Sequence, residues 1–295
     1  MINIIDSQIA RKTEFKISEL RTDWVFESSR PTMKARLSRI VKSLTKRRRF
    51  PEWDVRQEPV QSTRWIVYFL YSLTGLISAA HSFTLSRLGK ENAKLLVVAT
   101  GLQASEISRL SDIVDALVLK ENDGYDFSAY AIALDVLIDY SPSTDILFLN
   151  DSVLGPFSNL ENLVWQSPWD FTGMLASSEC ENHIQSFAFS IKNCTRQRKE
   201  ALDPIFTLDY TLNYFGDVVA LKETQMARIA SKTMSVGARW YSPPNFAMNA
   251  SMQRPFDLIS VGFPFLKKAN LEKHAYLHDQ SKMRAFLKYV GHPPM

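Results

Sequence analysis

After Pro51 the sequence alternates between short apolar segments with strand character and longer segments with helical periodicity, and this alternation limits the possible folds. The strand-like runs include "WIVYFLY", "AKLLVVAT", "DALVLK" and "DILFLN". Between the last two, "DFSAYAIALDVLIDY" places its apolar residues on one helical face. Strands that alternate with helices predict a mainly parallel sheet covered by helices. We therefore predict an α/β fold.

One segment, Trp65 to Leu85, is uncharged and about as long as a membrane-spanning helix. Its second half is rich in Ser, Thr and His, and Gly75 divides an aromatic, β-branched first half from a helix-like second half. A buried strand that runs into a helix fits this pattern better than a membrane span.

The composition is that of a globular protein, with 295 residues, of which 45% are hydrophobic and 12% aromatic. Cys180 and Cys194 are the only cysteines, so the sequence has no disulfide framework and no CxxC metal motif. The first residues lack the basic and long apolar regions of a secretory signal. We expect a cytoplasmic protein.

The positive charge is concentrated in Met33 to Arg49, which has eight Lys or Arg and no acid, although the whole chain carries only +4. Leu37, Ile40, Val41 and Leu44 form an apolar stripe at helical spacing within it. Two interpretations stay open: a helix on an anionic membrane surface, or a solvated helix whose stripe packs on the protein. A nucleic-acid partner is not expected, because no nucleic-acid-binding motif follows. We predict a basic helical arm over 1–60 and one domain over 61–295.

Polar clusters follow two of the predicted strands. "KENDGYDF" comes after "ALVL", and Asn150, Asp151 and Ser152 end "DILFLN". In open α/β sheets, ligands bind at the rim where parallel strands end. Gly124 is expected to adopt a left-handed backbone or to allow a close approach to the ligand. Tyr125 either stacks on a ligand or belongs to the core.

Asn-x-Gly before a helix, followed by a strand with a short acidic motif, resembles the nucleotide-sugar half of GT-A glycosyltransferases. More closely, "KENDGYDFSAY", "LFLNDSVLGPF", "WDFTGM", "HIQSF" and "GFPFLKK" resemble the successive blocks of the rhamnan synthesis protein F family of bacterial polysaccharide enzymes. The blocks keep the family order from about Trp65 to Lys268. The resemblance implies a GT-A-like, Rossmann-type domain that binds a nucleotide sugar.

A nucleotide-sugar transferase must neutralise the charge that grows on the diphosphate leaving group. GT-A enzymes commonly use Mg²⁺ or Mn²⁺ on an Asp-x-Asp motif, but here Asp151 is the only carboxylate of that motif. Either Asp151 holds a metal together with phosphate oxygens, or lysines replace the metal. Asp126 is a donor ligand or a favourable charge at a helix N-terminus. The expected donor-binding residues are Lys120, Asn122, Gly124, Tyr125, Asp126, Asn150, Asp151, Ser152, Lys267 and Lys268.

An inverting transfer needs a general base near the acceptor hydroxyl. The resemblance assigns this role to Glu223, which opens "ETQMARIASKTMSVG", with a non-catalytic helix-terminal acid as the alternative. Asp170 is the competing candidate. His183, Gln185 and Ser186 of "HIQSF" are expected to bind acceptor hydroxyls.

The sequence thus predicts a glycosyltransferase that moves a sugar, with dTDP-rhamnose as the donor that the resemblance suggests, to a lipid-linked or growing surface polysaccharide. The expected location is the cytoplasmic face of the bacterial plasma membrane. Two rival functions remain: a non-catalytic nucleotide-sugar-binding module of an assembly complex, favoured by the neutral Asn150 and Ser152, and a retaining transferase.

Overall fold

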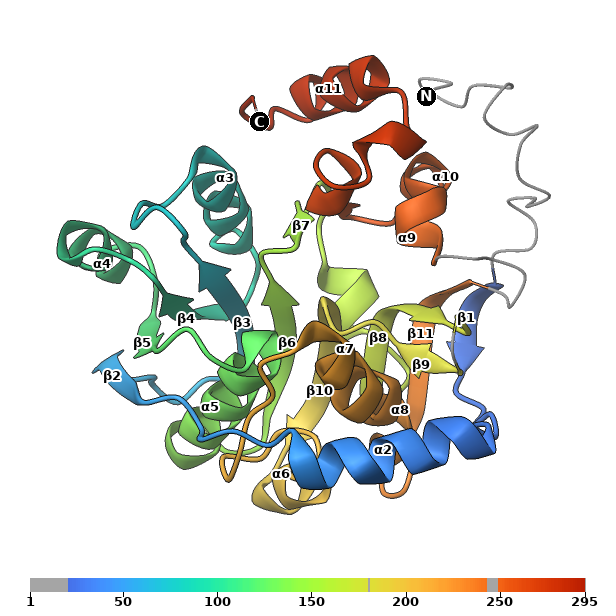
Figure 1. Ribbon diagram of the computed structural model, residues 1–295. Helices are drawn as coiled ribbons and strands as arrows, with labels where there is room; N and C mark the ends of the chain where they lie inside the picture. Colours follow the sequence, from blue (N-terminus) through green and yellow to red (C-terminus); the bar gives the residue numbers. More distant parts are fainter. Residues whose placement is uncertain (1–20, 180, 243–248, 295) are drawn as a thin grey trace.

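The computed structural model describes residues 21–179, 181–242 and 249–294. A ten-stranded sheet runs through this part of the chain, with helices on both faces (Figure 1). β3, β4, β5, β6, β8 and β11 run in one direction, whereas β1, β2, β9 and β10 are antiparallel to their neighbours. The predicted fold class, a mixed and mainly parallel sheet flanked by helices, is confirmed. In spatial order the strands are β1 (Arg21–Val25), β11 (Val236–Ser242), β8 (Phe171–Ser177), β10 (Ala188–Cys194), β6 (Thr144–Asn150), β3 (Arg64–Tyr71), β4 (Lys94–Thr100), β5 (Ala116–Lys120) and β2 (Trp53–Gln57), and β9 (His183–Ile184) pairs with β8.

Both faces of the sheet are buried, which explains why the central strands are almost continuously apolar. Along β3, Trp65 and Val67 belong to a core shared with α5, α6 and α8, whereas Ile66 and Tyr68 belong to a core shared with α3, α4 and α10. Side chains that alternate between two apolar layers require an apolar residue at every position. The helices are α2 (Met33–Thr45), α3 (Ala79–Leu88), α4 (Ala104–Ser111), α5 (Tyr125–Tyr140), α6 (Arg196–Leu202), α7 (Phe215–Val218), α8 (Thr224–Ala230), α9 (Ala250–Gln253), α10 (Pro255–Ser260) and α11 (Gln280–Tyr289), with shorter turns η2 (Glu161–Trp165), η3 (Val219–Glu223), η4 (Lys268–Asn270) and η5 (Ala275–Leu277).

The uncharged segment from Trp65 to Leu85 forms strand β3 and most of helix α3, as predicted. The two elements are joined by a turn in which Gly75 has φ +84°. In the part of the chain that the structure describes, none of the helices has the length and apolarity that a membrane crossing requires.

The region before residue 60 contributes more than a helix. β1 pairs with β11 at one edge of the sheet, and β2 pairs with β5 at the other. The predicted helix is present as α2, between these two strands in sequence. From residue 21 to residue 60, therefore, the chain is part of the sheet domain with α2 on its surface, rather than a separate arm (Figure 1). The first twenty residues of the predicted arm lie outside the described residues.

A small second sheet connects distant parts of the chain. β7 (Val153–Leu154) directly follows the end of β6 and pairs with β12 (Leu266–Lys267). Leu154 and Leu266 pack with Met283 and Phe286 of the C-terminal helix α11. This pairing brings the segment that ends in Lys267 and Lys268 to the polar rim of the main sheet.

Candidate active site

The polar residues predicted at the ends of β5 and β6 meet at the same edge of the sheet. Asp126 lies in the first turn of α5, and Asn150 is the last residue of β6. Asn150 Nδ2 donates a hydrogen bond to Asp126 Oδ2 over 2.7 Å. The two sequence clusters, 24 residues apart, therefore form one site at the carboxyl ends of the parallel strands, although β3 and β4 lie between β6 and β5 in the sheet.

The turn after β6 gives the neutral residues of the motif a specific role. Asn150 Oδ1 accepts hydrogen bonds from the amide and the hydroxyl of Ser152, at 3.1 and 2.5 Å. Because its oxygen is occupied in this way, the Asn150 amide group directs its nitrogen toward Asp126. An aspartate at position 150 would instead face the Asp126 carboxylate with a second negative charge. The neutral side chain is thus suited to this arrangement.

Two lysines reach the site through the β7–β12 pairing. Lys267 Nζ lies 3.3 Å from Ser152 Oγ and 4.0 Å from the centroid of the Phe187 ring. Lys268 Nζ lies 3.6 Å from Asp151 Oδ2. Burial lowers the pKa of Lys267 to about 8, although the nearby carboxylates Glu223 and Asp126 favour its charged form.

Glu223 reaches the same cluster from the other side. It is the last residue of the π-helical turn η3 and directly precedes α8. Its Oε2 atom accepts hydrogen bonds from the amide and the hydroxyl of Ser186, at 3.1 and 2.6 Å. The helical conformation starts before Glu223, in α7, so this residue is not simply an acid at a free helix N-terminus. π-helical turns often occur at functional sites.

Ser186 connects the two carboxylates. Its hydroxyl lies 2.6 Å from Glu223 Oε2 and 3.2 Å from Asp126 Oδ2. Burial, reinforced by the negative charge of Glu223, raises the pKa of Asp126 to about 6. Two carboxylates joined by one hydroxyl, with a lysine beside them, form a site in which protons and charge can be redistributed.

The raised pKa of Asp126 predicts a specific pH dependence of stability. A carboxyl group with a pKa near 6 in the folded state and 3.8 in the unfolded state binds more protons when folded, so it destabilises the fold as pH rises through that window. Asp126→Asn should therefore raise the free energy of unfolding by about 1–3 kcal/mol at pH 7.5 and leave it nearly unchanged at pH 4. Thermal unfolding at both pH values checks this.

The exposed pair of Asp139 and Arg196 provides the control. Asp139→Asn should change the free energy of unfolding by less than about 1 kcal/mol at either pH, because exposed ion pairs contribute little. An Asp126→Asn variant that is destabilised at pH 7.5 would contradict the electrostatic description of this carboxylate.

Lys120 is the last residue of β5, and its ammonium group forms hydrogen bonds with the protein backbone. The side chain is buried, and Nζ donates to the carbonyl oxygens of Glu121 and Asp123 at 2.7 and 2.9 Å. It therefore fixes the loop before α5 and is not presented as a free cation to a donor. Burial lowers the pKa of Lys120 to about 8.

The loop between β5 and α5 is held close to a distant segment. Gly124 has φ +80°, which confirms the left-handed backbone, and a Cβ atom there would lie 1.9 Å from Thr211 Oγ1, so the close approach in the structure is to this side chain. Asn213 accepts a hydrogen bond from the Gly124 amide over 3.1 Å and donates one to Asp123. Asn122 is exposed in the same loop. Tyr125 is 44% exposed, which excludes the core interpretation, and its ring lies near that of Phe215.

Asp170, the competing base, lies at the amino-terminal ends of the parallel strands, whereas the polar cluster lies at their carboxyl ends. It precedes β8, which runs in the same direction as β6, so it lies near the start of β6 rather than near Asn150. Its carboxylate pairs with Arg198 at 2.8 Å and accepts two hydrogen bonds from Ser235. The hydrogen bonds from Ser235 and the charge of Arg198 outweigh partial burial and lower the pKa of Asp170. This residue has a structural role.

His183 and Gln185 are also placed differently from the prediction. Both side chains are buried, so they do not face an acceptor. His183 Nδ1 donates to the Glu181 carbonyl over 2.7 Å, and Nε2 accepts from Gln185 Nε2 over 2.8 Å. Burial lowers the pKa of His183, and this favours the neutral ring that the hydrogen bonds require. His183 Nε2 also lies 4.0 Å from Glu223 Oε1.

Two residues of the site carry no sequence signal that would have identified them. His81 Nε2 lies 3.3 Å from Asp151 Oδ2, so Asp151 has His81 on one side and Lys268 on the other. Phe187 supplies the ring beneath Lys267. Each contact joins elements that are far apart in sequence, and only the folded chain brings them together.

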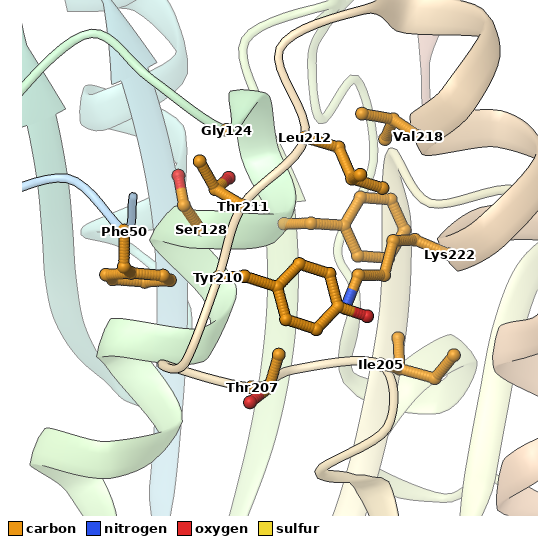
Figure 2. Close-up of a pocket in the computed structure, with 11 residues that line it drawn as sticks. Phe50, Gly124, Ser128, Ile205, Thr207, Tyr210, Thr211, Leu212, Val218 and Lys222 are labelled. Carbon is orange, nitrogen blue, oxygen red and sulfur yellow. The ribbon is translucent and has the colours of Figure 1, made fainter. Parts of the chain in front are cut away.

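A separate small pocket lies between the start of α5, including Gly124, and the segment from residue 205 to residue 222 (Figure 2). It is lined mainly by apolar and hydroxyl side chains, including Phe127, Tyr210 and Leu212. Lys222 reaches into it, and its Nζ lies 4.6 Å from the centroid of the Tyr210 ring. Of the predicted donor residues only Gly124 lines this pocket, so the polar cluster around Asp126, and not this pocket, is the candidate active site.

The chain is similar to a curated protein over a short segment and to several solved structures. Over 85 residues it is 40% identical to virulence protein VirA of Vibrio anguillarum, a match that covers 28% of this chain and 27% of the relative. Similar solved structures include a nucleotide-diphospho-sugar transferase described as putative from Desulfovibrio desulfuricans G20 (9% identity, TM-score 0.41, 78% of this chain and 97% of that chain). They also include the inositol-1-phosphate CTP transferase of T. maritima (12% identity, TM-score 0.39, 68% of this chain and 96% of that chain). A third is the galactosyltransferase LgtC (12% identity, TM-score 0.37, 59% of this chain and 72% of that chain).

The family model described as rhamnan synthesis protein F matches residues 95–291, which is about two thirds of the chain. The matched range includes each residue of the polar cluster named above except His81. The chain therefore belongs to the rhamnan synthesis protein F family.

Proposed function

We propose that this protein transfers a sugar from a nucleotide diphosphate to a hydroxyl group of a lipid-linked or growing surface glycan, with inversion at the anomeric carbon. The observation that carries the proposal is the convergence of Asp126, Glu223 and Lys267 at the carboxyl edge of the sheet. A general base, a second acid and a cation within one small region are the groups that such a transfer requires.

Glu223 is the proposed general base. Both hydrogen bonds from Ser186 go to Oε2, so the other oxygen, Oε1, can take the proton of the acceptor hydroxyl. These bonds also fix the orientation of the carboxylate, which matters because a base must lie within hydrogen-bond reach of its substrate. Proton removal makes the acceptor oxygen nucleophilic as it attacks the anomeric carbon, and the nucleoside diphosphate leaves.

Lys267 and Lys268 are the proposed ligands of the diphosphate. Lys267 has both an apolar contact with Phe187 and polar contact with Ser152, so its ammonium group is held in place before the donor binds. A fixed cation in a site of low polarity stabilises the charge that develops on the leaving group. Its neighbours Asp126 and Glu223 favour the charged form of Lys267, which this role needs.

A divalent metal ion would find few protein ligands in this cluster. Among the described residues, no group of three or more His, Cys, Asp or Glu side chains could hold a metal ion. Asp151, the carboxylate assigned to the metal by resemblance, is flanked by His81 and Lys268, which compete for it. We therefore favour charge neutralisation by lysines over a role for Mg²⁺ or Mn²⁺.

A panel of nucleotide sugars, dTDP-rhamnose among them, tests the proposed function by calorimetry followed by a donor-hydrolysis assay. We expect one donor to bind with a Kd in the micromolar range, and chelation by EDTA to change its Kd and its turnover by less than about twofold. Binding that needs Mn²⁺ would return Asp151 to the role of metal ligand. Failure of every donor to bind would contradict the proposed transferase.

The two rival functions predict other results for the same assay. A non-catalytic module binds the donor but never hydrolyses or transfers it. The neutral Asn150 and Ser152 favour this rival by sequence, yet both have hydrogen-bonding roles that orient Asp126 and the turn after β6. A retaining transferase forms a product with the anomeric configuration of the donor and would not need Glu223 as a base. NMR analysis of the product anomer distinguishes the two stereochemical outcomes.

A further inference from the structure

Helix α2 presents its apolar residues to solvent. Five side chains form a stripe along it, because at 100° per residue they fall within one face of the helix. Their exposed fractions lie between 57% and 77%, and α2 has no buried residue. The sequence left open whether this stripe packs on the protein, and the structure shows that it does not. We call these five residues the α2 stripe: Met33, Leu37, Ile40, Val41 and Leu44.

The opposite face of α2 is fixed to the domain by cations. Arg39 forms an ion pair with Glu181 and donates to the Ala220 carbonyl over 3.0 Å and to Thr224 Oγ1 over 3.1 Å. Lys42 Nζ lies 2.7 Å from Asp217 Oδ1. Glu181 and Asp217 are both buried, so the cations of α2 pair with carboxylates that lie within the domain. Polar contacts therefore set the rotation of α2 about its axis and keep the α2 stripe facing outward.

Cations also border the α2 stripe. On the helix, Lys34 and Arg36 lie on opposite sides of it, and both are exposed. The segment from residue 33 to residue 49 contains no acidic residue. A second copy of the chain would bring two such cationic borders together, which is unfavourable. An anionic surface with an apolar interior fits both features, because it accepts the stripe and pairs with its borders.

We propose that α2 is an interfacial helix that binds the protein to a bilayer containing anionic lipids, with the α2 stripe inserted among the lipid chains. Figure 1 shows α2 along one side of the domain, next to the segment of α7 and α8. Thr224, which Arg39 contacts, follows Glu223 directly. The bound bilayer thus lies on the same side of the protein as the segment that carries the proposed base. The proposal itself depends on α2 alone and holds whether or not the protein is a transferase.

Cosedimentation of the full chain with vesicles tests this proposal. Deletion of the N-terminal region would also remove β1, so point substitutions in the exposed stripe are the better variants. We expect the wild type to bind phosphatidylglycerol–phosphatidylcholine vesicles, and L37S/V41S/L44S to bind at least about tenfold more weakly. K34S/R36S should weaken binding to these vesicles severalfold, and added salt should remove this difference.

The double variant L73S/I113S is the matched control, since it removes two exposed apolar side chains outside α2. Its vesicle binding should equal that of the wild type. Circular dichroism should show that all variants keep the wild-type fold, because the substituted side chains are exposed. The proposal is overturned if the wild type does not bind the vesicles or if the stripe variant binds as well as the wild type. It is also overturned if sedimentation velocity shows a lipid-free dimer that L37S/V41S/L44S converts to a monomer.

Discussion

Replacement of Glu223 by Gln is expected to lower kcat by about 10²–10⁴-fold, the usual contribution of a general base. The glutamine side chain can still accept the two hydrogen bonds from Ser186 through its amide oxygen, so the local structure should be kept. Donor affinity should stay within about twofold of the wild type, because the proton is taken from the acceptor and not from the donor. Initial rates at saturating donor, together with calorimetry, separate the two quantities.

Asp170→Asn is the matched control for this variant, since Asp170 is the other acid that the sequence offers as the base. It should unfold more easily, because it weakens contacts with Arg198 and Ser235. Its kcat should nevertheless equal that of the wild type, since it lies at the opposite edge of the sheet. A wild-type kcat in Glu223→Gln would remove this residue from the mechanism, and a large loss in Asp170→Asn would reinstate its rival.

The second large effect is expected at Lys267. Methionine can keep the contact with the Phe187 ring but has no charge, so Lys267→Met should weaken donor binding about 10- to 100-fold. The loss should be similar for the free nucleoside diphosphate, because the proposed contact is with the phosphates and not with the sugar. Lys267→Arg should keep part of the affinity, since the charge remains. Calorimetry with the donor and with the diphosphate measures both values.

Lys222→Met provides a comparison at a second lysine whose pKa burial lowers to about 8. Lys222 lines the pocket of Figure 2 rather than the proposed active site. Its substitution should leave donor affinity within about twofold of the wild type. If the Lys222 and Lys267 variants lost donor affinity equally, the diphosphate would not bind where we place it.

Much of the fold could be predicted because its central strands are buried on both faces. The segments of β3 to β6 are apolar runs bounded by polar residues. The sequence predicts one apolar face for the helix between β5 and β6, whereas in the structure it is buried at almost every position from Phe127 to Ile138. The sequence does not predict the edge strand β2, because in "WDVRQ" only alternate residues are partly buried and the segment is not an apolar run. Its position depends on pairing with β5, which is distant in sequence.

The candidate site could be predicted where it depends on strand ends. Asp126, Asn150 and Ser152 follow from the rule that parallel strands end at one edge. The prediction that Asp170 borders the acceptor is wrong, because the sequence does not show in which direction β8 runs and so at which end of the strands it begins. The periodicity of α2 was clear, but the sequence could not say which face is buried. Ion pairs with Glu181 and Asp217, which are more than 140 residues away, decide this.

The central claim is that the cluster of Asp126, Glu223 and Lys267 binds the sugar diphosphate. A crystal structure of the protein with the donor selected by the panel, or with its nucleoside diphosphate, tests this most directly. The β-phosphate should lie within hydrogen-bond distance of Lys267 Nζ, with the sugar between it and Glu223. Electron density for the nucleotide in the Lys222 pocket, or anywhere away from the end of β6, would contradict the assignment.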